Sequence, residues 1–102
     1  MAAERIEIPL VIGSQRIQTD ATGTSVMPHR HRHVLATYSK AAPQHVAQAI
    51  KAATAAHREW SSWTFEDRAA VFLRAAELLA TTWRDTLNAA TMLGQSKTVY
   101  QR

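Results

Sequence analysis

Three histidines alternate with two arginines in the first half of the chain, and imidazole nitrogens are common metal ligands. They are His29, His31 and His33, separated by Arg30 and Arg32. On a β-strand, side chains two residues apart share a face, so the three imidazoles would face one way and could bind zinc or nickel. Three ligands on one strand do not surround a metal, and no Asp, Glu or Cys lies nearby to complete a tetrahedral site. We therefore interpret the run as a solvated basic turn, with adventitious metal binding as the alternative.

A second run, Gly94-Gln95-Ser96-Lys97-Thr98, resembles the end of a phosphate-binding P-loop. A P-loop has a glycine directly before the lysine and another one five residues earlier, and this run has neither. A P-loop also follows a strand, whereas a helical pattern precedes Gly94. The run therefore predicts a helix-to-helix turn rather than a nucleotide site.

Trp60, Trp63 and Trp83 could stack on nucleic-acid bases. All three lie on or beside apolar helical stripes, which favours packing in a core or an interface. His45 and His57 lie on the first predicted helix, and we interpret both as surface or boundary residues. The chain shows no Ser/His/Asp set, no paired carboxylates and no Gly-rich dinucleotide loop. The residues themselves therefore assign no catalytic, cofactor-binding or metal-binding residue.

The composition is that of one small globular domain, with 102 residues, 46% hydrophobic residues and no cysteine. No run approaches the roughly 20 apolar residues of a membrane helix, and no secretory signal is visible. The absence of cysteine excludes disulfides, thiolate metal sites and a cysteine nucleophile, and favours a reducing, cytosol-like compartment. The net charge of +4 is concentrated in the first half, without the dense Lys/Arg stripe of a nucleic-acid binder.

Strands and turns are predicted over residues 1–40. Ile8–Ile12 is a short apolar run, and Gly13-Ser14 fits a type II′ turn that returns the chain as a hairpin. Two strands alone are marginal in water, so this hairpin must dock on another element. We expect a polar loop over Asp20–Ser25 and a further strand over Val34–Tyr38 that is buried on both faces.

Helices are predicted over residues 41–102. The first begins at Pro43, a residue suited to a first turn, and its alanine-rich apolar stripe ends at Trp60. The second begins after Thr64, a good N-cap with the acidic Asp67 three residues later. Its apolar stripe consists of Phe65, Ala69, Phe72, Ala76 and Leu79. The width of this stripe predicts a mostly buried helix.

A third helix is predicted from about Trp83 to Leu93. Gly94 is expected to supply the left-handed residue that ends it. Ser96 could then cap a further short helix that starts at Lys97. The chain would stop at Arg102 inside that element.

Three segments form a pattern that is shared with a known family. Trp60 is followed by Arg68-Ala69 and an apolar helix, Pro28-His29 forms a turn, and residues 91–99 read Thr-Met-Leu-Gly-Gln-Ser-Lys-Thr-Val. Together, over residues 6–102, they resemble the aldehyde dehydrogenase superfamily. The turn and the last segment are most similar to its 1-pyrroline-5-carboxylate branch.

The resemblance implies an α/β fold in which residues 1–102 are the N-terminal portion of an aldehyde dehydrogenase domain. It implies a parent enzyme that oxidises L-glutamate γ-semialdehyde to L-glutamate with NAD in proline degradation, using a cysteine thiolate and a glutamate base. It also implies a homo-oligomer without nucleic-acid or membrane partners, in the cytoplasm or, in a eukaryote, the mitochondrial matrix. The family's nucleophile, base and cofactor site lie beyond the matched region, so no residue role is carried over.

On this interpretation the chain is an inactive fragment whose partner is the remainder of the dehydrogenase fold. Two alternatives remain. One is a small basic helical module for interaction or nucleic-acid binding, through the region of Arg30 and Arg32. The other is a free-standing regulatory subunit that docks on a full-length dehydrogenase.

Overall fold

The structure is a computed structural model of the chain, and it describes residues 2–101. The elements are β1 (Ile6–Ile8), β2 (Leu10–Ile12), β3 (Gln15–Ile17), β4 (Thr22–Met27), β5 (Arg30–Ser39), α1 (Pro43–Ser62), α2 (Phe65–Ala80), α3 (Arg84–Gln95) and a short 3₁₀ helix, η1 (Val99–Gln101). Strands followed by three helices confirm the predicted fold class.

The β2–β3 hairpin follows the prediction, with Ile12 paired to Gln15 across a two-residue turn. Gly13 has a φ of 60°, the left-handed value that a type II′ turn requires at its first position. The predicted single strand over Ile8–Ile12 is wrong, because Pro9 has no amide hydrogen and divides the run. The part before Pro9 belongs to β1, which pairs with β5, and the part after it is β2.

The main sheet has the order β1-β5-β4, with β1 parallel and β4 antiparallel to β5. The predicted loop over Asp20–Ser25 is wrong, since most of it belongs to β4. This strand lies at the edge of the sheet and its residues 22–25 are mostly exposed, so their polar composition resembles that of a loop. Gly23 pairs with Tyr38, and a Cβ at this glycine would overlap the Tyr38 ring. The absence of a side chain at Gly23 therefore leaves room for the Tyr38 ring.

The buried core is small. Met27 and Ala36 are the only buried hydrophobic residues among residues 2–101. Ala36 lies on the central strand β5, but Tyr38 is 39% exposed, so the predicted burial of this strand on both faces is only partial.

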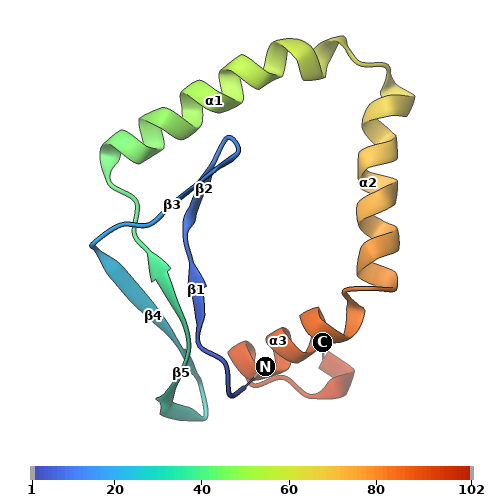
Figure 1. The fold of residues 1–102 in the computed structure, drawn as a ribbon. Helices are drawn as coiled ribbons and strands as arrows, with labels where there is room; N and C mark the ends of the chain where they lie inside the picture. Colours follow the sequence, from blue (N-terminus) through green and yellow to red (C-terminus); the bar gives the residue numbers. More distant parts are fainter. Residues whose placement is uncertain (1, 102) are drawn as a thin grey trace.

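The elements form an open arc rather than a ball. Figure 1 shows the sheet on one side, with α1, α2 and α3 following one another around to the chain end. The radius of gyration is 17.2 Å, whereas a compact chain of this length has about 13 Å. The accessible surface is 8290 Å², against about 5,700 Å² for a compact monomer of the same mass. The arc therefore exposes about 2,600 Å² more than a self-contained domain would.

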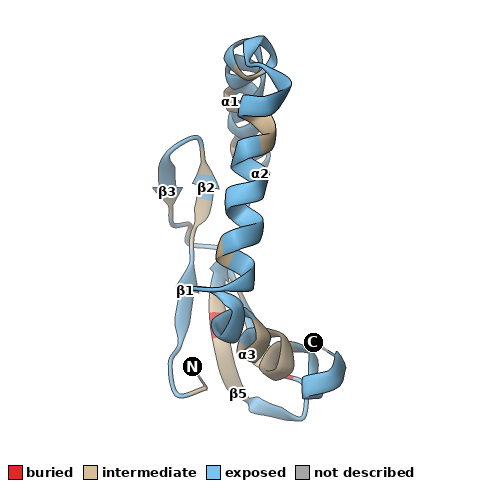
Figure 2. Cartoon of the chain, turned by 90° about the vertical axis from the view of Figure 1, so that its right-hand side faces the viewer, coloured by how far each residue is buried: buried red, intermediate tan, exposed pale blue. Residues whose placement is uncertain are grey.

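The prediction that α2 is mostly buried is wrong. None of the residues of this helix is buried, and Figure 2 shows α1 and α2 largely in the colour of exposed residues. Phe65 and Phe72, two members of its apolar stripe, are 72% and 67% exposed. The periodicity correctly identified one apolar face, but the rest of residues 2–101 covers it only in part, with Trp60 against Phe72.

Candidate functional site

The three alternating histidines do not converge. His29 lies in the turn between β4 and β5, and its Nδ1 shares a hydrogen bond of 2.8 Å with Ser96 Oγ. His31 and His33 lie on β5, where His33 Nε2 donates to the carbonyl oxygen of Ala2. Within residues 2–101 there is no group of three His, Asp or Glu side chains that could hold a metal ion. The two bonded imidazoles instead tie distant parts of the chain together.

The Gly94–Thr98 segment is not a phosphate loop. Gly94 and Gln95 are the last residues of α3, so the prediction that Gly94 ends the helix in a left-handed conformation is wrong. Ser96 takes that conformation instead, with a φ of 52°. The hydrogen bond to His29 explains the left-handed conformation of Ser96, because it holds the Ser96 side chain against the β4–β5 turn.

The predicted cap at Ser96 is also wrong. The amide of Thr98 donates to Oε1 of Gln101 at 3.1 Å, and the amide of Gln101 donates back to the carbonyl oxygen of Thr98 at 3.0 Å. Thr98 therefore precedes η1, which begins at Val99, two residues later than the expected start at Lys97.

Two further helix starts show which polar groups have a structural role. Thr64 Oγ1 accepts the amide of Asp67 at 3.1 Å, which confirms the predicted cap of α2. His45 Nδ1 accepts the amide of Ala42 at 2.9 Å at the start of α1. His57 is exposed on α1. His45 is half-buried, so the two positions agree with our interpretation of these histidines as boundary and surface residues.

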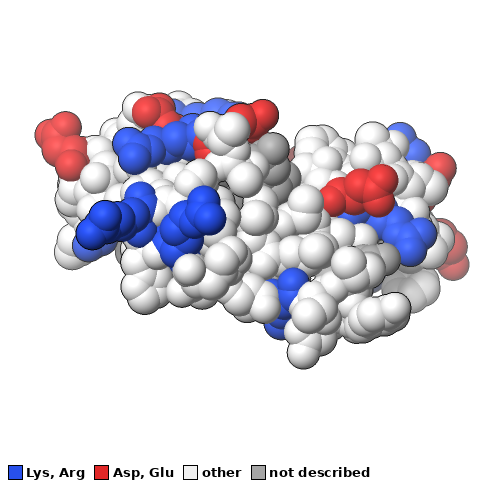
Figure 3. All heavy atoms as spheres, turned by 90° about the horizontal axis from the view of Figure 1, so that it is seen from below, with Lys and Arg blue, Asp and Glu red and all other residues white. Residues whose placement is uncertain are grey.

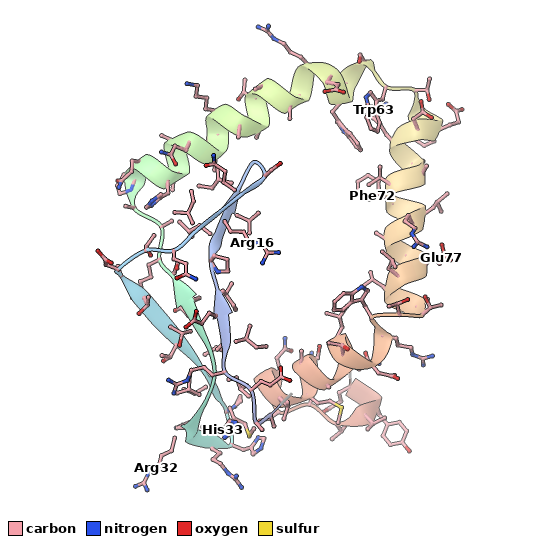
Figure 4. The ribbon with its side chains drawn as sticks, viewed as in Figure 1. Arg16, Arg32, His33, Trp63, Phe72 and Glu77 are labelled. Carbon is pink, nitrogen blue, oxygen red and sulfur yellow. The ribbon has the colours of Figure 1, made fainter. Side chains whose placement is uncertain are left out.

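The aromatic residues gather where α1 meets α2. The ring centroid of Trp60 lies 5.4 Å from that of Trp63 and 6.5 Å from that of Phe72. Figure 4 shows Phe72 projecting from α2 towards the concave side of the arc. These contacts agree with packing rather than base stacking as the role of Trp60 and Trp63.

A pocket opens beside this cluster, and we call it the corner pocket. It is lined by Trp60, Phe65, Arg68, Ala69, Phe72 and Leu73. Its walls are mainly apolar, and its one charged member, Arg68, is half-buried. The Nε atom of Arg68 is buried and has no hydrogen-bond partner in the described part of the chain. A buried donor of this kind is uncommon in folded proteins and indicates a missing acceptor.

The remaining charges are mostly at the surface. Figure 3 shows blue Lys and Arg atoms and red Asp and Glu atoms at both ends of one face, with most of the blue atoms towards the sheet end. Figure 4 shows Arg32 pointing away from the arc and Arg16 pointing from β3 towards its concave side. The one ion pair among residues 2–101 joins Arg74 and Glu77 of α2 at 2.9 Å. No described helix is long and apolar enough to cross a membrane.

Comparison with known proteins defines the class first. The model of the aldehyde dehydrogenase family matches residues 17–102, so the chain belongs to the aldehyde dehydrogenase family.

Its relatives indicate which members of this family the chain is most similar to in sequence and structure. The chain is 41% identical, over 94% of its length, to a probable delta-1-pyrroline-5-carboxylate dehydrogenase from Schizosaccharomyces pombe, and 39% identical, over 92%, to the human enzyme of that name, which is called mitochondrial. It matches the crystal structure of the delta-pyrroline-5-carboxylate dehydrogenase from Mycobacterium tuberculosis with a TM-score of 0.93 and 48% identity over 98% of the chain. The same enzyme bound with NAD gives a TM-score of 0.93.

The chain spans only a small part of these proteins. It covers 18% of the Schizosaccharomyces pombe relative, 17% of the human one and 19% of the Mycobacterium tuberculosis chain. The arc is thus a shape that occurs within a much larger enzyme of the same family.

The sequence did not predict that Nε of Arg68 would be buried without a hydrogen-bond partner among residues 2–101. Its signal was present, because Arg68 belongs to the pattern Trp60…Arg68-Ala69 that supported the family resemblance. The pattern did not reveal that these side chains line one pocket, since that depends on the angle between α1 and α2.

Proposed function

We propose that residues 1–102 form the N-terminal portion of a dehydrogenase that oxidises L-glutamate γ-semialdehyde, the open-chain form of 1-pyrroline-5-carboxylate, to L-glutamate in proline degradation. The observation that carries this proposal is the match to the Mycobacterium tuberculosis structure, which extends over 98% of the chain. That match includes both the sheet and the helical arm, so it is not limited to one common motif.

The role of the chain within this enzyme is to be a scaffold. Its polar groups cap helices, as Thr64 and His45 do at the starts of α2 and α1. The extra surface of the arc and its exposed apolar stripe suit a segment that packs against further protein. The nucleophile and the general base of the reaction are assigned to the rest of the enzyme.

The oxidation needs an acceptor for the hydride of the aldehyde carbon, and NAD is the acceptor we propose. Water supplies the second oxygen of the carboxylate product. The residues of this chain do not themselves fit the cofactor, because the candidate phosphate loop is the last turn of α3 and not a glycine-rich loop after a strand. The binding of NAD is therefore also assigned to the rest of the enzyme.

A reducing compartment suits the absence of cysteine. We propose the cytoplasm or, for a eukaryotic source, the mitochondrial matrix, with the complete enzyme acting as a homo-oligomer. No observation favours the nucleic-acid-binding alternative, and the Lys and Arg atoms on the face shown in Figure 3 do not form a dense stripe.

A chimeric enzyme tests the proposal. In it, this chain replaces the matched segment of the Mycobacterium tuberculosis enzyme, and NADH formation is measured with 1-pyrroline-5-carboxylate and with a short unbranched aldehyde. We expect activity with a preference for 1-pyrroline-5-carboxylate, and no activity from the 102-residue chain alone. A soluble chimera that does not reduce NAD, while the unaltered enzyme does, would contradict the proposal.

A further inference from the structure

We infer that the corner pocket is an anchoring site for one segment of the remaining dehydrogenase, which places an apolar side chain in the pocket and a carboxylate against Nε of Arg68. This inference rests on the proposed function for the identity of the partner. It goes beyond that function by naming the residue that holds the two parts together and the chemistry of the group it holds.

The first support is the state of Arg68 itself. A guanidinium is always charged and can only donate hydrogen bonds, so its buried Nε–H needs an acceptor. On a helix, the partners of a residue lie three and four positions away. For Arg68 these are Thr64, Phe65, Val71 and Phe72, and none of them is acidic. The helix therefore cannot neutralise this cation with its own side chains.

Arg74, on the same helix, shows the contrast. It lies three residues before Glu77, and its Nη1 donates to Oε2 of Glu77 at 2.9 Å. Both side chains are more than 60% exposed, and Figure 4 shows Glu77 on the convex side of α2. One arginine of α2 is thus paired with Glu77, and the other lies beside an apolar pocket without an ion pair in the described part of the chain.

The second support is the pocket around Arg68. Phe65 and Phe72 leave 72% and 67% of their surface uncovered, although they flank the half-buried guanidinium. A partner that covers these aromatic walls would enclose the cation in a setting of low dielectric, in which a charge-assisted hydrogen bond is strong. A partner segment with an apolar side chain beside a carboxylate fits both the apolar walls of the pocket and the Nε–H of Arg68.

The third support is the size and charge of the uncovered surface, which indicate what kind of partner fits it. The excess surface of about 2,600 Å² on this chain alone exceeds the roughly 800 Å² that each partner contributes to a standard stable interface. Arg16 also points towards the concave side and has no ion pair among residues 2–101. A second copy of this chain would bring the same two unpaired arginines into the interface. The remainder of a dehydrogenase, of which this chain covers about a fifth, can instead supply acidic side chains.

The test uses the chimera with a specific protease site placed directly after this segment. The enzyme is purified as one chain and cleaved, and the rate at which the 102-residue piece dissociates is followed by native mass spectrometry. The variants are Arg68→Met, which keeps an unbranched apolar stem, and Arg68→Lys, which keeps the charge but has no Nε–H. Arg74→Met is the matched control on the same helix.

We expect both Arg68 variants to release the piece about tenfold faster or more, the loss typical of a charge-assisted hydrogen bond, and Arg74→Met to release it at the unaltered rate. Equal rates for Arg68→Met and Arg74→Met would overturn the inference. If Arg68→Met does not yield soluble enzyme, Arg68→Lys decides, and an unaltered rate for it has the same meaning. An inactive parent chimera is evidence against the proposed function, whereas an active chimera that is insensitive at Arg68 refutes only the anchor.

Discussion

Urea is expected to unfold the isolated chain over an unusually broad range of concentration. The slope of the free energy of unfolding against urea, the m-value, is proportional to the surface that unfolding exposes. An extended chain of 11.3 kDa exposes about 16,400 Å². Because the arc already exposes 8290 Å², unfolding adds about 8,100 Å², whereas a compact chain would add about 10,700 Å². We therefore expect about three quarters of the m-value of a compact domain of this length.

The assay is a urea titration followed by far-UV circular dichroism and by tryptophan fluorescence. All three tryptophans lie beyond residue 40, so their emission reports on the helical arm. Trp63 and Trp83 are already 41% and 51% exposed, so unfolding should shift the emission maximum only slightly. A compact reference domain of about 100 residues, measured in the same buffer, is the control. A steep transition with the m-value of that reference, accompanied by a large red shift, would refute the open arc.

Three substitutions test local features, each by the change in the free energy of unfolding. Thr64→Ala removes the cap of α2 and should cost about 1 kcal/mol, while Thr64→Ser should cost little; an unchanged Thr64→Ala protein would show that the cap contributes nothing. Gly23→Ala should displace the Tyr38 ring and cost about 1 to 3 kcal/mol, a cost that should largely vanish in a Tyr38→Ala background; full additivity would contradict the contact. Ser96→Gly should be nearly neutral alone, because it removes both the strain of a left-handed serine and the hydrogen bond to His29 that offsets this strain. In a His29→Ala background that hydrogen bond is already lost, so Ser96→Gly should stabilise the protein by about 1 kcal/mol. Equal effects in both backgrounds would show that the hydrogen bond does not offset the strain.

The features that the sequence predicted correctly depend on neighbouring residues alone. The left-handed Gly13 in its turn and the cap at Thr64 involve atoms within a few residues of each other. The start of α1 at Pro43 is of the same kind. Local chemistry decides such features, so they could be derived without knowledge of the tertiary structure.

The features that the sequence did not predict depend on distant residues. Residues 22–25 form a strand because β5 supplies their hydrogen-bond partners. The left-handed residue that follows α3 is Ser96 and not the expected Gly94. A hydrogen bond joins Ser96 to His29, 67 residues away. The stripe of α2 indicated which face is apolar, but periodicity carries no information on whether another element covers that face. The corner pocket was missed for the same reason.

The central claim is that the concave side of this arc is covered by the rest of a dehydrogenase. Hydrogen exchange measured by mass spectrometry tests it most directly, by comparing the amides of α2 in the isolated chain and in the active chimera. We expect exchange over residues 65–80 to slow by about tenfold or more in the chimera, because covering the apolar stripe stabilises the helix against local opening. Equal exchange rates in the two proteins would contradict it.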